Sequence, residues 1–104
     1  MDNETFTITQ SYADGKFRLY AKGRVDANNS EELLNALEEN LAKGKKEIIL
    51  NMSEVNYLSS IGIRAVLKIY KEALRKESKF YIEKPSEVVQ NILGMAALKE
   101  MLIA

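Results

Sequence analysis

The sequence contains no cysteine and no histidine, and its single proline is Pro85. Without cysteine the chain has no disulfide framework and no thiolate chemistry, as suits a reducing compartment. Without histidine it lacks the base of a Ser-His triad, a common metal ligand and the commonest general base. No phosphate-binding loop or paired-carboxylate motif replaces them. Catalysis by Asp, Glu, Lys or Tyr stays open, but we expect a protein that is not an enzyme, with no catalytic residue, metal or cofactor.

A net charge is also absent, because 15 basic residues balance 15 acidic ones. Nucleic-acid binding normally needs an excess of positive charge, so no direct contact with nucleic acid is expected. The first ten residues have neither the basic start nor the apolar stretch of a signal peptide. The longest apolar runs, such as IIL and AAL, are too short to span a bilayer. These absences predict a soluble, cytoplasmic protein without membrane insertion.

What is present suits one domain over residues 1–104. The chain is 46% hydrophobic, which is enough for one core, and no linker or repeat divides it. Near the start, Phe6 and Ile8 alternate with threonines, and a second alternating run covers residues 16–22. The pair Asp14-Gly15 between these runs favours a tight turn. An antiparallel hairpin is therefore predicted.

Helical and strand patterns alternate after the hairpin. The leucines of the first helix form one apolar stripe, and Asn29 or Ser30 caps its start. The first apolar strand is nearly continuous, which is typical of a strand buried on both faces. The expected elements are a helix over 27–44, a strand over 45–52, a connector over 53–58, a helix from Ile61 with an apolar stripe to Leu74, a strand over 78–84, and one broken or two short helices over 86–104.

This order predicts an α/β domain. A helix between two buried strands implies a parallel pair joined by a right-handed crossover. The hairpin adds an antiparallel edge. The expected fold is a single domain with a mixed β-sheet, an antiparallel N-terminal hairpin and helices packed against the sheet.

Two adjacent serines, Ser59 and Ser60, follow the connector and begin the second helix in the stretch NYLSSIGIRAVL. Serine is a favoured N-cap, and capping alone could account for both residues. The start of a helix also stabilises negative charge through its free N–H groups and its dipole, so a phosphate on serine would be well placed there. The residues by themselves leave both roles open.

The stretch IILNMSEVNYLSSIGIRAVL resembles the central motif of the STAS family, the sulphate-transporter and anti-sigma-factor-antagonist domains. That motif is an apolar strand, a D-L-S-like turn, a connector and then D-S-S/T-G-L at the start of a helix. The segment GRVDANNSEELLNAL is similar to the family's G-x-L-D segment. Aligned on Gly62, the phosphorylated serine of the family's regulatory members corresponds to Ser60, and the aspartate before it to Ser59. The D-L-S turn corresponds to residues 51–53.

The resemblance implies an anti-sigma factor antagonist that binds an anti-sigma factor, itself a serine-protein kinase, and is released when Ser60 is phosphorylated. The alternative is a STAS-type interaction subunit of a larger signalling or transport assembly that works without phosphorylation. The partner-binding residues implied by the resemblance are Asp26, Asn28, Asn51, Ser53, Ser59, Ile61, Gly62 and Arg64.

Three features also have a simpler structural explanation, which does not require a partner. Asp26 could simply help to cap the first helix. Arg64, four residues after Ser60, begins a basic stripe that could be an ordinary solvated helix face. The apolar residues near the C-terminus could cover the sheet or form a partner groove; they are Met95, Leu98, Met101 and Leu102.

Overall fold

The computed structural model describes residues 6–94, and its elements follow the predicted order. The C-terminal apolar residues considered above lie outside this range. The elements are β1 (Thr7–Ala13), β2 (Lys16–Val25), α1 (Ser30–Ala42), β3 (Glu47–Leu58), α2 (Ser60–Arg75), β4 (Lys79–Glu83) and α3 (Glu87–Gly94). No helix within residues 6–94 is long and apolar enough to cross a membrane.

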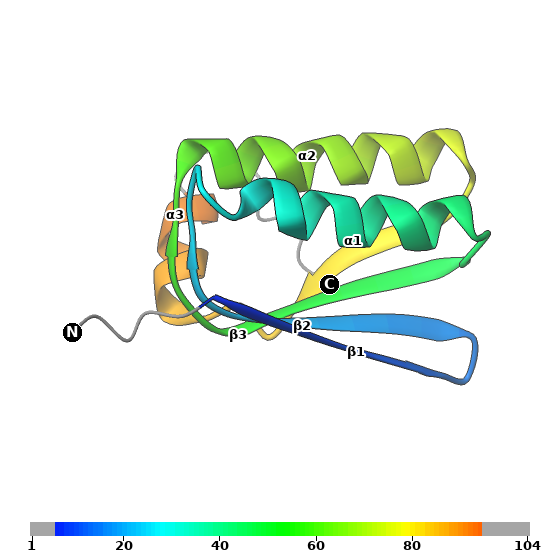
Figure 1. Cartoon of the computed structure of the whole chain (residues 1–104), viewed down its shortest axis with the longest axis horizontal. Coiled ribbons are helices and arrows are strands. Elements are labelled where there is room, and N and C mark those ends of the chain that lie inside the picture. Colours follow the sequence, from blue (N-terminus) through cyan, green and yellow to red (C-terminus); the bar gives the residue numbers. More distant parts are fainter. Residues whose placement is uncertain (1–5, 95–104) are drawn as a thin grey trace.

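The strands form one mixed sheet in the order β1-β2-β3-β4. β1 pairs antiparallel with β2, and the pairs β2–β3 and β3–β4 are parallel. Helices α1 and α2 lie side by side over one face, and α3 packs at the end where β3 curves upward (Figure 1). We call the opposite face, which no described helix covers, the open face. The predicted mixed sheet is confirmed.

The hairpin turn has the geometry that its sequence favours. Ala13 and Lys16 are paired across a two-residue turn. The turn residues Asp14 and Gly15 both have positive φ, 56° and 76°. Such turns match the twist of the strands and prefer Asp-Gly or Asn-Gly. The turn therefore fixes the register of β1 on β2.

The core lies between the sheet and the two helices. Leu19 of β2, Leu37 of α1 and Ile69 of α2 are each at most 1% exposed. Full burial of one such side chain contributes about 1.5–3 kcal/mol relative to exposure. Within α2, Ala73 takes the inward position of the last turn, so Leu74 points away and is 59% exposed. The predicted extension of the apolar stripe to Leu74 is wrong.

β3 is longer than predicted, because the expected connector over 53–58 continues the strand to Leu58. Val55 and Leu58 are buried and pair with Gly23 and Val25 of β2. Two register shifts interrupt this pairing and replace the simple inward–outward alternation. Such irregularities bend a strand, and the polar residues of 53–58 that resemble a connector are exposed.

Candidate functional site

The two serines have different environments. Ser59 is the N-cap of α2, and its Oγ accepts a hydrogen bond of 3.1 Å from the N–H of Gly62. Its own N–H donates to the carbonyl oxygen of Val25 at 2.9 Å. The N–H of Ser59 thus joins the start of α2 to the end of β2, and its hydroxyl caps the first turn of α2. The capping interpretation is correct for Ser59.

Ser60 is the first residue of α2, and its side chain is exposed. Within residues 6–94 its hydroxyl makes no hydrogen bond, and the N–H groups of Ser60 and Ile61 meet no acceptor. Unpaired N–H groups at a helix start attract anions, and the helix dipole adds to this effect. Ser60 therefore offers a free hydroxyl at an electropositive helix end.

The loop before α1 lies next to this helix start, because Asp26 directly follows Val25. The Asp26 carbonyl accepts from the N–H of Ser30 at 2.9 Å, and its Oδ1 accepts from the N–H of Asn28 at 3.0 Å. Asn29 is the N-cap, yet its side chain bonds the Asp26 N–H at 2.9 Å rather than a helix N–H. The structure thus brings Asp26 and Asn28 to the site, and it gives Asp26 a role in starting α1.

Gly62 packs against both strand ends more closely than any other residue type allows. A Cβ on Gly62 would lie 2.8 Å from Cδ1 of Leu58 and 2.9 Å from Cγ1 of Val25. It would also lie 3.3 Å from the Val25 carbonyl oxygen. The glycine of the motif is needed for this close approach and not for an unusual backbone angle.

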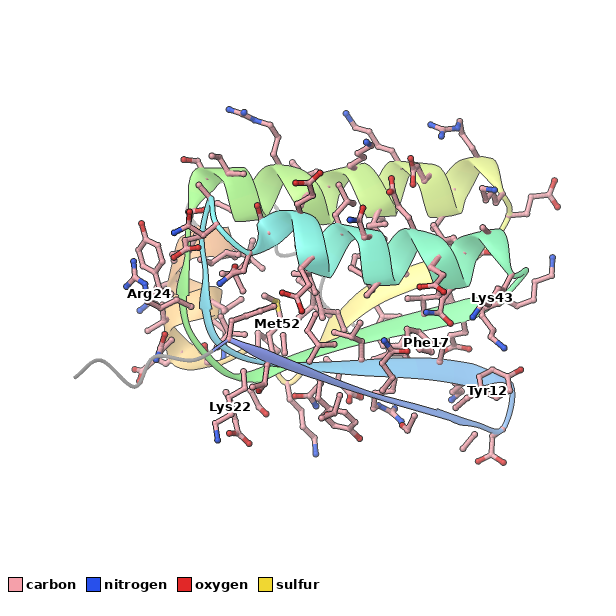
Figure 2. All side chains as sticks on the ribbon, viewed as in Figure 1. Tyr12, Phe17, Lys22, Arg24, Lys43 and Met52 are labelled. Carbon is pink, nitrogen blue, oxygen red and sulfur yellow. The ribbon has the colours of Figure 1, made fainter. Side chains whose placement is uncertain are left out.

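A cation–π pair beside the site, Arg24 with Tyr57, was not predicted from the sequence. The guanidinium of Arg24 lies 4.1 Å from the ring centroid of Tyr57, and its Nε is 3.7 Å from Oδ2 of Asp26. Figure 2 shows Arg24 at the end of the molecule where α2 begins. Arg24 and Tyr57 face each other only because β2 and β3 pair at this register. No sequence motif marks that register.

An open groove of about 330 Å³ runs between α1 and α2 beside Ser60. Its apolar part includes Leu34 and Ile61, and Ile61 is 44% exposed. Arg64 and Lys68 line its α2 side; Lys68 is 3.6 Å from Glu38, whereas Arg64 makes no ion pair within the described residues. An exposed apolar side chain flanked by a cation is a common feature of protein-binding surfaces.

Asn51 and Ser53 lie elsewhere, on the open face of the sheet. Asn51 is 6% exposed, and its Oδ1 accepts from the N–H and Oγ of Ser53 at 3.1 and 2.8 Å. Its Nδ2 donates to Glu83 at 2.9 Å, and Arg18 binds both oxygens of Glu83, at 2.6 and 3.1 Å. The structure therefore separates Asn51 and Ser53 from the residues around Ser60.

Glu83 is the charged centre of this network. Burial by itself raises the pKa of Glu83, but hydrogen bonds from Arg18 and Asn51 stabilise its charged form and hold the pKa below its ordinary value. Within residues 6–94 no three acidic side chains gather in a way that could hold a metal ion. The network is thus a set of satisfied structural bonds.

Comparison with known protein families identifies the family to which this chain belongs. The family model described as the STAS domain matches residues 11–103. The chain belongs to the STAS domain family. A relative in Bordetella bronchiseptica, BtrV, is 31% identical over 65 residues, and its name assigns it provisionally to the anti-sigma factor antagonists. That match spans 62% of this chain and 56% of BtrV, a little over half of the relative's length.

Solved STAS-like structures share the fold at low sequence identity. An anti-sigma factor antagonist from Mycobacterium paratuberculosis superposes with a TM-score of 0.87 at 18% identity, covering 98% of this chain and 87% of that one. The anti-sigma factor antagonist SpoIIAA in its unphosphorylated form gives 0.79 at 18% identity, covering 96% and 88%. Phosphorylated SpoIIAA of Bacillus gives 0.73 at 17% identity, covering 96% and 91%. These similarities extend over nearly the whole STAS domain.

The close packing at Gly62 of this STAS domain can be tested by adding one methyl group. Gly62→Ala should destabilise the domain by about 1–2 kcal/mol, because overpacking against Val25 outweighs the gain in helix propensity. Gly94→Ala is the matched control, since among the described residues a Cβ there meets no atom within 4 Å. Urea unfolding measures both. A Gly62→Ala domain as stable as the Gly94→Ala domain would contradict the packing argument.

Asn51 stands where the STAS motif has an aspartate, and the structure gives a physical reason. Asn51→Asp should lower stability by about 1–3 kcal/mol at pH 7, because it replaces the donor to Glu83 with a second carboxylate. Folding lowers the pKa of Glu83, so the wild type gains stability as pH rises towards the ordinary carboxyl pKa and keeps that gain at higher pH. In the Asn51→Asp variant, repulsion between the new carboxylate and that of Glu83 weakens when one of them is protonated. The difference in stability from the wild type should therefore shrink at pH 4.

The double variant Asn51→Asp/Glu83→Gln restores one donor and one acceptor to this contact and serves as the control. It should recover part of the stability lost in Asn51→Asp when both are measured by urea unfolding at pH 7. A pH-independent defect, or no recovery in the double variant, would show that Asn51 is not matched to Glu83.

Proposed function

We propose that this STAS domain is a cytoplasmic anti-sigma factor antagonist. It binds an anti-sigma factor that is a serine kinase, and phosphorylation of Ser60 by that kinase ends the binding. The names of BtrV and of the structural neighbours support the class of function. The main structural support is the division of roles between the serines, with Ser59 hydrogen-bonded as the cap and Ser60 exposed.

The proposed partner surface consists of the residues around Ser60. Ile61, Gly62 and Arg64 come from the first turns of α2, and Asp26 and Asn28 from the loop beside it. The apolar groove at Ile61 provides area to bury, and the charged side chains at its margin provide orientation. Asn51 and Ser53 act in this proposal only by supporting the sheet, which revises their expected contact with the partner.

Phosphorylation would change charge and leave the fold intact. A phosphate on Ser60 carries about −1.5 to −2 charges at neutral pH. The N–H groups of Ser60 and Ile61 and the dipole of α2 stabilise that charge within the domain. A partner surface that packs on the groove would meet a new, strongly hydrated anion beside Ile61. Release of the partner follows from this desolvation cost and from repulsion by any acidic group placed there.

The phosphorylated residue can be identified directly. After incubation with the cognate kinase and ATP, mass spectrometry should map one phosphate to Ser60. Ser59→Ala should still be phosphorylated and should lose about 1 kcal/mol of stability through the lost cap. Ser60→Ala should accept no phosphate and keep wild-type stability. Phosphate on Ser59, or on neither serine, contradicts the proposal and favours a STAS module that binds its partner without phosphorylation.

Arg64 is proposed to partly neutralise the phosphate. Ser60 and Arg64 are separated by four positions, which places them on one side of a helix, and guanidinium can bind phosphate through two hydrogen bonds. Arg64→Ala should therefore reduce the stability of phosphorylated relative to unphosphorylated protein by less than about 1 kcal/mol at low salt, and by less at high salt. Lys71→Ala, on the same helix, is the control. If Arg64→Ala leaves this difference unchanged at low salt, the pairing is wrong.

A further inference from the structure

The sheet has two edge strands, and only one of them is protected against pairing with another strand. β4 is five residues long and carries charges at both ends, Lys79 and Glu83. β1 is seven residues long, has the sequence TITQSYA, and contains neither charge nor proline. Edge strands are usually guarded by charge, proline, a bulge or short length. The regular, uncharged β1 has none of these protections.

The hairpin register determines which main-chain groups β1 presents. A two-residue turn closes with a hydrogen-bonded pair, here Ala13 and Lys16. Hydrogen-bonded and non-hydrogen-bonded pairs alternate along an antiparallel ladder. The main-chain N–H and C=O groups of Ile8, Gln10 and Tyr12 therefore point away from β2. Within residues 6–94 no strand pairs with this edge.

We propose that two copies of this chain associate by antiparallel pairing of their β1 strands about a two-fold axis at Gln10. Among the two-fold registers, this one pairs all the outward main-chain groups of β1. Gln10 faces Gln10 of the second copy, and Ile8 faces Tyr12 of the second copy, each pair exchanging two hydrogen bonds. On the open face, Thr9 comes opposite Ser11 of the second copy. The two sheets become one continuous sheet.

The side chains of β1 complement one another in this register. Aromatic residues opposite β-branched ones, and hydroxyl residues opposite each other, are favourable cross-strand pairs. Tyr12 is 56% exposed, and Lys45 lies 3.9 Å from its ring centroid, so pairing covers an exposed aromatic ring without opposing like charges on β1. The balanced charge of the chain also allows two copies to approach. These features favour a second copy over an unrelated peptide.

This surface is separate from the proposed partner surface. Figure 2 shows Tyr12 and Arg24 at opposite ends of the molecule. Pairing through β1 uses no residue of α2, so it neither depends on nor tests the proposed phosphorylation of Ser60. The dimer presents two copies of the α2 start, one from each chain.

Sedimentation equilibrium of the full chain tests the proposal. One strand pairing buries a small interface, so the dimer should be weak, and the average mass should rise from monomer towards dimer between about 10 μM and 1 mM. Gln10→Lys places like charges on the axis and should weaken dimerisation roughly tenfold or more, as should Gln10→Glu. An equimolar mixture of the two variants places opposite charges there and should restore association. Leu74→Lys removes the most exposed large apolar side chain among the described residues and should leave the dimer unchanged.

A wild-type mass that stays monomeric up to about 1 mM would overturn the proposal. So would a dimer that resists both charged variants or a mixture that fails to associate. Hydrogen exchange of the wild-type protein requires no substitution and covers the case of a variant that does not fold. The amides of Ile8, Gln10 and Tyr12 should exchange more slowly at high protein concentration, whereas those of β4 should not change. Equal exchange of the β1 amides at both concentrations would exclude the pairing.

Discussion

The contact between the end of β2 and the start of α2 is the constraint on which the site depends. The Val25 carbonyl accepts the N–H of Ser59, and the absence of a side chain at Gly62 lets the helix turn approach Val25 and Leu58. This contact determines where α2 begins and which serine is the cap. Ser60 is left one residue further on, at the exposed end of the helix dipole.

Both departures from the family's aspartates have a local explanation. Ser59 provides the capping oxygen that an aspartate could also provide. The side-chain amide of Asn51 donates a hydrogen bond to Glu83, whereas a carboxylate at this position would repel Glu83. The cap preserves the geometry at the start of α2 without a negative charge beside Ser60. In the proposed switch, an unphosphorylated site with less negative charge would give a phosphate on Ser60 a larger relative effect on a bound partner.

Local patterns in the sequence were sufficient to predict the element order, the hairpin turn at Asp14-Gly15 and the mixed sheet. They failed where the tertiary register decides the outcome. Val55 and Leu58 belong to β3 because of register shifts against β2, which no pattern in 53–58 marks. The Arg24–Tyr57 contact depends on the same register and was missed.

Only part of the candidate site could be predicted from the sequence, because tertiary register also decides where some of its residues lie. Residues that are close in sequence, such as Ser59, Ser60 and Gly62, are held together by one helix turn, and the motif was enough to find them. Asn51 and Ser53 are near them in the motif, but a continuous strand carries them to the open face. Spacing in the sequence therefore could not show that Asn51 donates to Glu83 of β4, 32 residues further along the chain.

The central proposal is that one phosphate on Ser60 controls partner binding. It does so by changing the charge of the binding surface while the fold stays the same. The most direct measurement is calorimetric titration of the cognate anti-sigma factor with the unphosphorylated and the Ser60-phosphorylated domain, with thermal unfolding of both forms recorded alongside. We predict that phosphorylation weakens binding roughly tenfold or more while the unfolding temperature stays nearly constant, because desolvation and repulsion act only at the interface. Equal affinity of the two forms, or weaker binding accompanied by loss of the folded state, would contradict the account.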